Sequence, residues 1–265
     1  MFKIALYLLI AVVLAIFLLP FFYTVSPYEL DPTKILQAPT LEHLFGTDRL
    51  GRDMLARVLN GGQTSLIIGF LAASISSIVG LFIGINAGYF KGNIDKTITI
   101  MIDLFLTFPT FFLLLALVSY IQASALILII VISVTGWMGM ARMIRSESFA
   151  IGNKPFIKIL KVANVSTFKI IFKYFAPLLA PIFLISFTFG VGGSILAESG
   201  LSFLGLGVNP PSMSWGSLLS DGKAVIDIAW WVSFFPGFMI FLITFCLIQI
   251  SDYLQTLANS KEIVS

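Results

Sequence analysis

The chain has 265 residues, of which 58% are hydrophobic and only 11% are charged. Its mean hydropathy of +1.01 excludes a water-soluble domain and indicates a protein of the lipid bilayer. The net charge of +3 needs no nucleic-acid partner to explain it, and a single cysteine, Cys246, excludes a disulfide within the chain.

Six mostly apolar runs are each long enough to cross a hydrocarbon core of about 30 Å as an α-helix. In chain order they cover residues 4–23, 65–89, 98–120, 124–144, 174–196 and 228–250. We interpret the first run as a retained span and not as a signal peptide, because it is long and no clear small-residue cleavage site follows it. The sequence therefore predicts an all-α membrane protein with six transmembrane helices.

Small residues in two of these runs predict close helix packing. The stretches SISSIVGLFIGINAG and FTFGVGGS carry Gly and Ser at short spacing. Small side chains allow helix backbones to approach one another in lipid. The alternative interpretation is that both runs are plain lipid-facing helices.

The segment between the first two runs, TDRLGRDMLARVLNGG, mixes charged and apolar residues. The pattern predicts an amphipathic interfacial helix that begins near Thr47. Arg49, Arg52 and Asp53 then belong either to a docking surface for another protein or to a charged collar at the level of the lipid headgroups.

Three residues of the third run are candidates for a transport path or its gate. A charge inside a span is costly, so Asp103 either lines a path or pairs with an arginine such as Arg142. Phe108 and Pro109, in LTFPTFF, either kink the span and narrow a path or form a tolerated helix irregularity.

A lysine-rich segment, KPFIKILKVANVS, lies between the fourth and fifth runs. Asn153 is suited to cap the start of a short helix, Pro155 to occupy its first turn, and Asn164 to end it in the left-handed conformation. One face of this helix carries Lys154, Lys158 and Lys161. Another face carries the apolar residues Phe156, Ile159, Leu160 and Ala163. Such a helix is too short to cross, so it lies along either anionic lipid headgroups or a groove on a cytoplasmic protein.

The segment LSFLGLGVNPPSMSWGSLL is too broken by Gly and Pro to cross the membrane, yet too apolar for an ordinary exposed loop. It predicts a re-entrant or lid-like element over the outer mouth. Glu198, just before this lid, is a fourth candidate for the path or its gate, and we expect it to anchor the lid by hydrogen bonds rather than to contact a transported solute. The candidate lid or docking residues are Phe203, Leu204, Pro210, Pro211 and Trp215. The aromatic residues expected at the outer interface are Trp215, Trp230 and Trp231.

The distribution of basic residues predicts the orientation. With the N-terminus inside, eleven of the 16 lysines and arginines lie on the cytoplasmic side and five lie outside. This asymmetry follows the positive-inside rule. Both termini are therefore expected in the cytoplasm.

Other functional classes lack the residues that they need. An intramembrane enzyme requires paired carboxylates, a serine with a base, or several histidines, whereas the only histidine, His43, lies outside the spans. The stretch WGSLLSDGKA departs from a phosphate-binding loop, because five residues separate its glycines and Ala follows its lysine. Energy for transport must therefore come from a partner. Hydropathy alone leaves a stand-alone channel or a structural membrane protein as alternatives.

Four segments resemble a known family: HLFGTDRLGRDMLARVLNGGQTSL, FLTFPTFFL, WMGMARMIRSES and ILAESGLSFLGLGVNPPSMSWGSLL. They are similar to the permease subunits of bacterial ABC importers for peptides and nickel, and more narrowly to the second, C-type permease of dipeptide, oligopeptide and nickel systems. The resemblance runs from His43 to Tyr253. It implies a multi-pass protein of the bacterial inner membrane that carries small peptides, with nickel or a nickel chelate as the alternative cargo.

The same resemblance implies a set of partners. They are a second permease subunit that completes a heterodimer, two ATPase subunits that bind ATP and Mg²⁺, an extracytoplasmic solute-binding protein, and membrane lipids. The chain itself is then a transport subunit and not an enzyme, and it binds no metal or cofactor.

The resemblance also implies that the lysine-rich segment is a coupling helix that docks into the ATPase. Its residues are Pro155, Phe156, Ile157, Lys158, Ile159, Leu160, Lys161, Val162, Ala163 and Asn164. The family pattern there reads EAA followed by Gly, whereas this chain has Lys158, Ile159 and Leu160, with Asn164 at the Gly position. The exchange of Glu for Lys reverses a charge, so the individual contacts must differ.

We divide the chain into three parts on this basis. Residues 1–64 form the first span and the outer amphipathic segment. Residues 65–253 form the transmembrane core, with a coupling loop over about 146–173 and an outer lid over about 198–227. Residues 254–265 are expected to form a short cytoplasmic tail.

Overall fold

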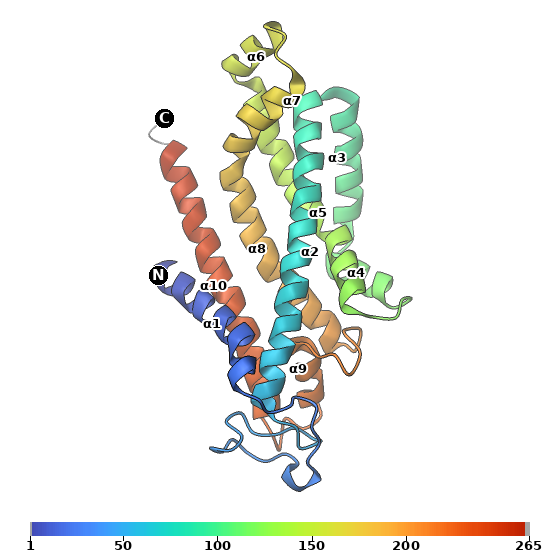
Figure 1. The fold of residues 1–265 in the computed structure, drawn as a ribbon. Coiled ribbons are helices and arrows are strands. Elements are labelled where there is room, and N and C mark those ends of the chain that lie inside the picture. The colour runs from blue at the N-terminus through green and yellow to red at the C-terminus, as the bar shows by residue number, and fades with distance from the viewer. Residues whose placement is uncertain (1, 263–265) are drawn as a thin grey trace.

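The computed structural model describes residues 2–262, which form a bundle of long helices with short helices at its two ends (Figure 1). The longer helices are α1 (Phe2–Phe22), α2 (Met54–Phe90), α3 (Gly92–Thr107), α5 (Ala125–Asn153), α8 (Ala176–Phe203) and α10 (Trp231–Glu262), and α3 is followed by the nine-residue helix α4 (Thr110–Val118). The shorter elements are η1 (Pro32–Lys34), α6 (Pro155–Val162), α7 (Thr167–Ile170), the π-helical turn η2 (Ile171–Phe175) and α9 (Trp215–Lys223).

Five helical segments are long and apolar enough to cross a membrane: α1, α2, α5, α10 and the run Thr167–Phe203. Within residues 2–262, the pair α3 and α4 passes the same test only when its two helices, bent by 81° at their junction, are taken together as one broken span. The break falls at Phe108 and Pro109, because proline has no N–H to donate and disfavours helical backbone in the residue before it. All six predicted runs therefore correspond to helices, and the third is broken more sharply than a kink.

The short helices mark the two ends of the bundle (Figure 1). We call the end that carries α6 the α6 end, and the opposite end, which carries α9 and the loop between α1 and α2, the α9 end. The N-terminal part of α1 lies against the C-terminal half of α10, where the rings of Phe2 and Tyr253 stack at 4.0 Å. α10 runs from the α9 end toward the α6 end, and α1 runs in the opposite direction. Phe2 and Glu262 are therefore both at the ends of their helices that are nearer the α6 end.

Glycines bring α2 and α5 into close contact. A Cβ built at Gly80, Gly84 or Gly88 would lie 2.7, 2.8 or 2.5 Å, respectively, from atoms of Met140, Ile144 and Ser148. These distances are too short for any side chain, so the prediction for SISSIVGLFIGINAG is confirmed. The approach is less tight at FTFGVGGS: a Cβ at Gly190 or Gly192 would lie in ordinary contact, 3.9 Å from Ala73 of α2 and 3.8 Å from Leu247 of α10, and one at Gly193 would meet nothing within 4 Å.

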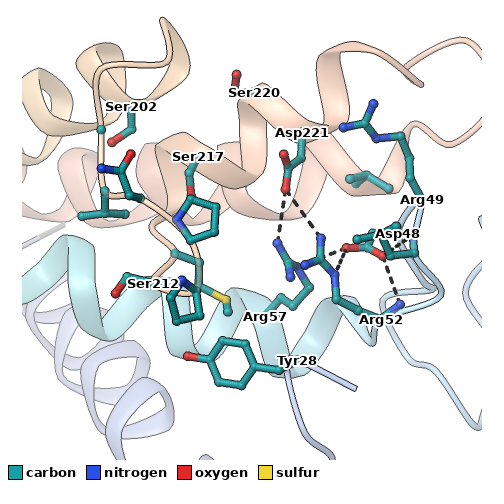
Figure 2. A pocket seen from close by; sticks show the side chains of 18 of the residues that line it. Tyr28, Asp48, Arg49, Arg52, Arg57, Ser202, Ser212, Ser217, Ser220 and Asp221 are labelled. Atoms are coloured by element: carbon teal, nitrogen blue, oxygen red, sulfur yellow. Dashed lines mark hydrogen bonds and ion pairs between the residues drawn. The ribbon is translucent and has the colours of Figure 1, made fainter. Parts of the chain in front are cut away.

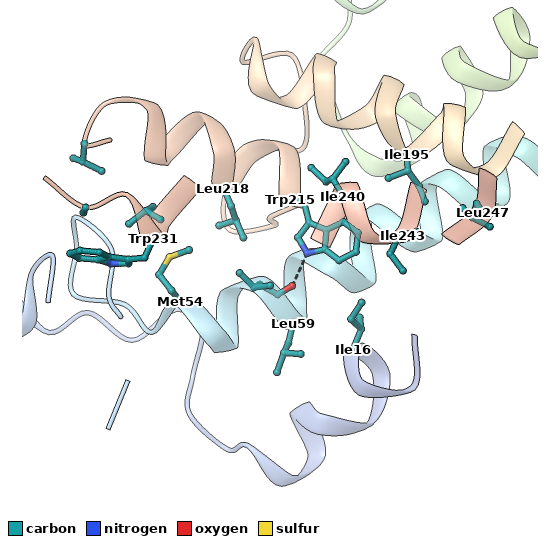
Figure 3. Packing of buried hydrophobic residues seen from close by; sticks show 14 residues of the cluster. Ile16, Met54, Leu59, Ile195, Trp215, Leu218, Trp231, Ile240, Ile243 and Leu247 are labelled. Atoms are coloured by element: carbon teal, nitrogen blue, oxygen red, sulfur yellow. Dashed lines mark hydrogen bonds between the residues drawn. The ribbon is translucent and has the colours of Figure 1, made fainter. Parts of the chain in front are cut away.

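Two tryptophans fill the core of the α9 end (Figure 3). Trp215 and Trp231 are buried, and their indole Nε1 atoms donate to the backbone oxygens of Val58 and Thr47 at 3.0 and 3.1 Å. Both tryptophans are therefore core residues of the α9 end and not lipid-facing members of an aromatic belt, because each indole N–H finds its partner inside the protein. Trp230 alone of the three is exposed.

The predicted interfacial helix near Thr47 does not form. α2 begins at Met54 and continues into the membrane span, and the Asp53 carboxylate caps it by accepting from the N–H of Ala56 at 2.8 Å. The preceding residues form a tight loop, because Gly51 has a φ of +74° and the Asp48 carboxylate accepts from backbone N–H groups within the same loop.

Two further boundaries differ from the sequence prediction. α8 extends to Phe203, so the lid segment starts only after Leu204. α10 extends to Glu262, so the part of the expected tail that the structure describes continues the last helix. Residues 263–265 of that tail lie outside the described part.

Candidate functional site

α6 is a separate short helix whose ends are set by local backbone chemistry. Pro155 occupies its first position, as expected, but Asn153 does not cap it, because Asn153 is the last residue of α5 and its Oδ1 accepts from Lys91 Nζ at 2.6 Å. The helix ends at Asn164, which has a φ of +55°. Asparagine tolerates this left-handed conformation, and the N–H of Val165 closes the turn on the oxygen of Leu160 at 3.1 Å.

One side of α6 is anchored in the bundle and the other is open. Ile157 is fully buried in a cluster with Ile151, Ile170 and Phe175, and Leu160 packs against the same cluster. The sequence prediction included Ile157 in the helix but not in its apolar face, although the i, i+3 spacing of Ile157 and Leu160 is the signal for a buried stripe. The side chains left uncovered are Phe156, Ile159 and Val162, of which Val162 is 84% exposed.

Two ion pairs join α3 to α5. Asp103 pairs with Arg142, and Asp95 pairs with Arg145 through two bonds, one of which is 2.9 Å long. The side chains of Asp103 and Arg142 are 58% and 54% exposed, so within this chain the pair faces outward from the bundle. The second pair was not predicted, because Asp95 lies before the third run and gives no sign of its partner in the sequence.

The break between α3 and α4 exposes an aromatic side chain. Phe108 is exposed, and Pro109 occupies the N-cap position of α4. Thr107 donates its hydroxyl to the backbone oxygen of Asp103 at 2.8 Å, which holds the last turn of α3. Asp103, Phe108 and Pro109 therefore lie on α3 and at its break with α4, whereas Glu198 lies on α8.

Glu198 is fully buried at the centre of a hydroxyl cluster in α8. It accepts from Ser65 at 2.9 Å and from Ser202 at 2.6 Å. Ser65 in turn accepts from the backbone N–H of Trp215 at 3.1 Å. The cluster joins α8, α2 and the first residue of α9, which is the geometry that an anchor for the lid requires.

An ion-pair network at the α9 end joins the loop before α2 to α9 (Figure 2). Asp48 accepts from Arg52 at 2.7 Å and lies 3.3 Å from the Nε of Arg57. Arg57 then donates to Asp221 at 3.2 Å. Arg57 is buried and Asp221 is not, so the network runs from the core to the surface.

A cavity of about 1010 Å³ lies beside this network. It is lined by residues of the loop before α2, of the loop after α8 and of α9, among them Arg49, Arg52, Pro210, Pro211 and Asp221. The amide of Asn209 donates to the backbone oxygen of Ala123 at 2.9 Å, which ties this wall to the loop before α5.

Several predicted docking residues are not available at this surface. Asp53 is buried, since it caps α2 and accepts from the Tyr23 hydroxyl at 3.0 Å and contacts His43 Nδ1 at 2.8 Å. Trp215 is buried as described above. Phe203, the last residue of α8, lies 5.5 Å below the Lys223 ammonium, and both Phe203 and Leu204 remain exposed.

Hydrogen bonds hold charged groups in place in the exposed loop between α1 and α2. The Thr33 side chain and backbone N–H both donate to Asp31, which lowers the pKa of that carboxyl below its ordinary value. The bond from Lys34 lowers the pKa of the Glu42 carboxyl in the same way. Both carboxylates are therefore ionised at neutral pH.

The sequence matches one protein family and many relatives. The family described as "Binding-protein-dependent transport system inner membrane component" matches residues 77–261. The chain is 34% identical over 260 residues to the oligopeptide transport system permease protein OppC of Haemophilus influenzae, covering 97% of this chain and 84% of that one. It is 36% identical over 251 residues to the dipeptide transport system permease protein DppC of Alkalihalophilus pseudofirmus, covering 94% and 82%.

The fold has a counterpart among solved structures. A chain in an inward-facing structure of the MetNI methionine ABC transporter superposes with a TM-score of 0.59 at 15% sequence identity, covering 76% of this chain and 97% of that chain. The likeness is one of fold. Together with the family match, it shows that the chain belongs to the binding-protein-dependent transport system inner membrane components, as a multi-pass inner-membrane subunit that is not itself catalytic.

Proposed function

We propose that this chain forms half of the translocation path of an ATP-driven importer for small peptides. The permeases reported above are named for oligopeptide and dipeptide transport, and each covers most of this chain. This supports peptides as the cargo ahead of nickel or a nickel chelate. The remaining half of the path comes from a second permease subunit, because one bundle of this size does not enclose a wide channel.

The α6 end faces the cytoplasm in this proposal. The positive-inside rule favours this orientation, since the helix ends and loops there carry Lys91, Lys96 and the lysines of α6. The α9 end then faces the extracytoplasmic binding protein, and its cavity lies where that protein delivers solute. ATP and Mg²⁺ bind to two partner ATPase subunits, and this chain holds neither.

α6 is the element that transmits the ATPase motion. The observation that carries the proposal is its two-sided structure: Ile157 is locked in the cluster formed by α5, η2 and α8, while Ile159 and Val162 are uncovered. A partner that grips the uncovered side moves the buried side with it, because packed cores shift as units. The ends of α5 and α8 follow.

Asp103, Arg142 and Phe108 are the proposed path or gate residues. An exposed ion pair at membrane depth is tolerated where water or another protein covers it. The outward-facing Asp103–Arg142 pair therefore belongs on the path or on the contact with the second permease, and not on the lipid face.

A crosslink from Ile159 tests the coupling role. In a Cys246→Ser background, Ile159→Cys is expected to crosslink to the ATPase encoded beside this gene, with a yield that changes when ATP is added. Glu147→Cys, on α5 below α6, is the control and is expected to give no product. Failure of the Ile159 variant to crosslink in either nucleotide state would refute the coupling role.

Peptide uptake tests the cargo. Cells that lack this chain are expected to lose uptake of labelled di- and oligopeptides and to regain it with the wild-type gene. Nickel uptake, measured in the same strains, is expected to be unchanged. The reverse pattern would assign the importer to nickel.

A further inference from the structure

The α6 end carries an unusual concentration of uncompensated positive charge. Between Glu147 and Glu198 the sequence contains no acidic residue and no arginine, but it contains the five lysines Lys154, Lys158, Lys161, Lys169 and Lys173. All five are exposed. None forms an ion pair with any residue in the described range 2–262.

An apolar ridge runs along α6 beside its lysines. Phe156, Ile159 and Val162 follow one another at intervals of three residues, and all are exposed, with Ile159 at 67%. Lys158 lies between the first two in sequence and shares the exposed side. Uncovered apolar side chains with a charged border are typical of a surface that another molecule covers.

The position of α6 favours a protein over the membrane surface as that molecule. α6 stands at the extreme end of the bundle, beyond the ends of α2 and α3 (Figure 1). A helix adsorbed on lipid turns its apolar side back toward the bilayer. Here the side that faces back carries Ile157, which the bundle core already covers, while Ile159 and Val162 point away from that core.

We propose that the partner groove that receives α6 has an apolar floor and a rim of acidic side chains. The inference rests on the proposed coupling function and specifies the chemistry of the ATPase surface. The apolar ridge fills the floor, and the lysines of α6 pair with the rim, Lys158 foremost because it flanks the ridge at its centre. Lys161 contributes less, since its ammonium already lies 4.1 Å above the ring of Tyr89.

Charge reversal at Lys158 tests the proposal in the complete permease pair, embedded in lipid nanodiscs and titrated with the purified ATPase. Lys158→Glu is expected to weaken ATPase binding roughly tenfold at low salt, and Lys158→Ala about threefold. Lys96→Glu is the matched control, because Lys96 is exposed on α3 at the same end of the bundle. The affinity of this variant for the ATPase is expected to equal that of the wild type.

Salt dependence gives a second readout of the same contact. Wild-type affinity is expected to fall as salt rises to about 1 M, where the Debye length is only about 3 Å, and the Lys158→Glu difference is expected to vanish there. Binding that is insensitive both to salt and to Lys158→Glu would overturn the acidic rim. If the Ile159→Cys crosslink still forms in that case, the coupling role stands and only the proposed groove chemistry fails.

The membrane alternative is an outcome of the same design. A fluorophore on Ile159→Cys, in nanodiscs without ATPase, is expected to report water in both zwitterionic and anionic lipid. A blue shift in anionic lipid alone that Lys158→Glu abolishes would show that α6 binds headgroups, and would overturn the proposal.

Discussion

At the residue scale, the buried Glu198 shows how one carboxylate holds three helices. Both of its oxygens accept from hydroxyls, and Ser65 passes the connection on to the backbone of Trp215. Glu198→Ala is expected to lower the free energy of unfolding by about 3 kcal/mol, because it leaves buried hydroxyls without an acceptor and opens a small cavity. Thermal unfolding of the purified protein in detergent measures this.

A conservative variant separates packing from hydrogen bonding at Glu198. Glu198→Gln keeps the volume but replaces one acceptor with a donor, so a loss of about 1–2 kcal/mol is expected. Asp227→Ala is the control, since Asp227 is an exposed carboxylate in the loop between α9 and α10, and no measurable change is expected. Equal stability of Glu198→Ala and wild type would rule out the anchoring role.

The Arg57–Asp221 pair is a second residue-scale test, because its two members differ in burial. Arg57 is 5% exposed at its side chain and Asp221 is 40% exposed. Arg57→Ala removes one of the two arginine partners of the buried Asp48 carboxylate. We expect it to lower the free energy of unfolding by about 3–5 kcal/mol. Asp221→Asn is expected to cost less than about 1 kcal/mol, because water screens its side of the pair. Chemical denaturation of both single variants and the double variant gives the coupling energy.

At the element scale, the contact between α2 and α5 depends on glycine. A Cβ at Gly84 would lie 2.8 Å from the backbone oxygen of Ala141 and from Ile144, so Gly84→Ala must push the helices apart. We expect a loss of about 1–3 kcal/mol. Gly193→Ala on α8 is the matched control, because its Cβ would meet nothing within 4 Å and alanine favours helix. The melting temperature of Gly84→Ala is expected to be lower than that of Gly193→Ala. Equal melting temperatures would contradict the close contact between α2 and α5 at Gly84.

Element boundaries show where local sequence signals compete. The charged and apolar mixture after Thr47 is typical of an interfacial helix, but Gly51 and the side chain of Asp48 close a loop there instead. Asp53 then has two roles, as the cap of α2 and as the partner of His43. A sequence pattern indicates which residues favour water or lipid. It does not indicate which backbone N–H groups will donate hydrogen bonds to a carboxylate.

At the scale of the whole molecule, the testable property is orientation. Single cysteines at Val162 and Arg49, each in a Cys246→Ser background, place one exposed probe at either end of the bundle. A membrane-impermeant thiol reagent is expected to label Arg49→Cys in intact cells, and Val162→Cys only after the membrane is opened. Labelling of Val162→Cys in intact cells would invert the topology and remove the basis of the coupling proposal.

The sequence by itself determined that this protein resides in a membrane, that it has six apolar runs, and that α6 exists. These features depend on composition and short-range spacing: runs of about 20 apolar residues for the spans, Pro155 for the start of α6 and Asn164 for its end. The motif resemblance also identified the family before any contact was known.

The tertiary structure alone decided which residues meet. Ile157, and not the ridge of Ile159 and Val162, anchors α6, because burial depends on what the neighbouring helices leave uncovered. Trp215 and Trp231 are buried in the core, because their indole N–H groups donate to backbone oxygens that are far away in sequence. Partners separated by more than 100 residues leave no periodic trace in the chain, since their distance is set by the packing of whole helices.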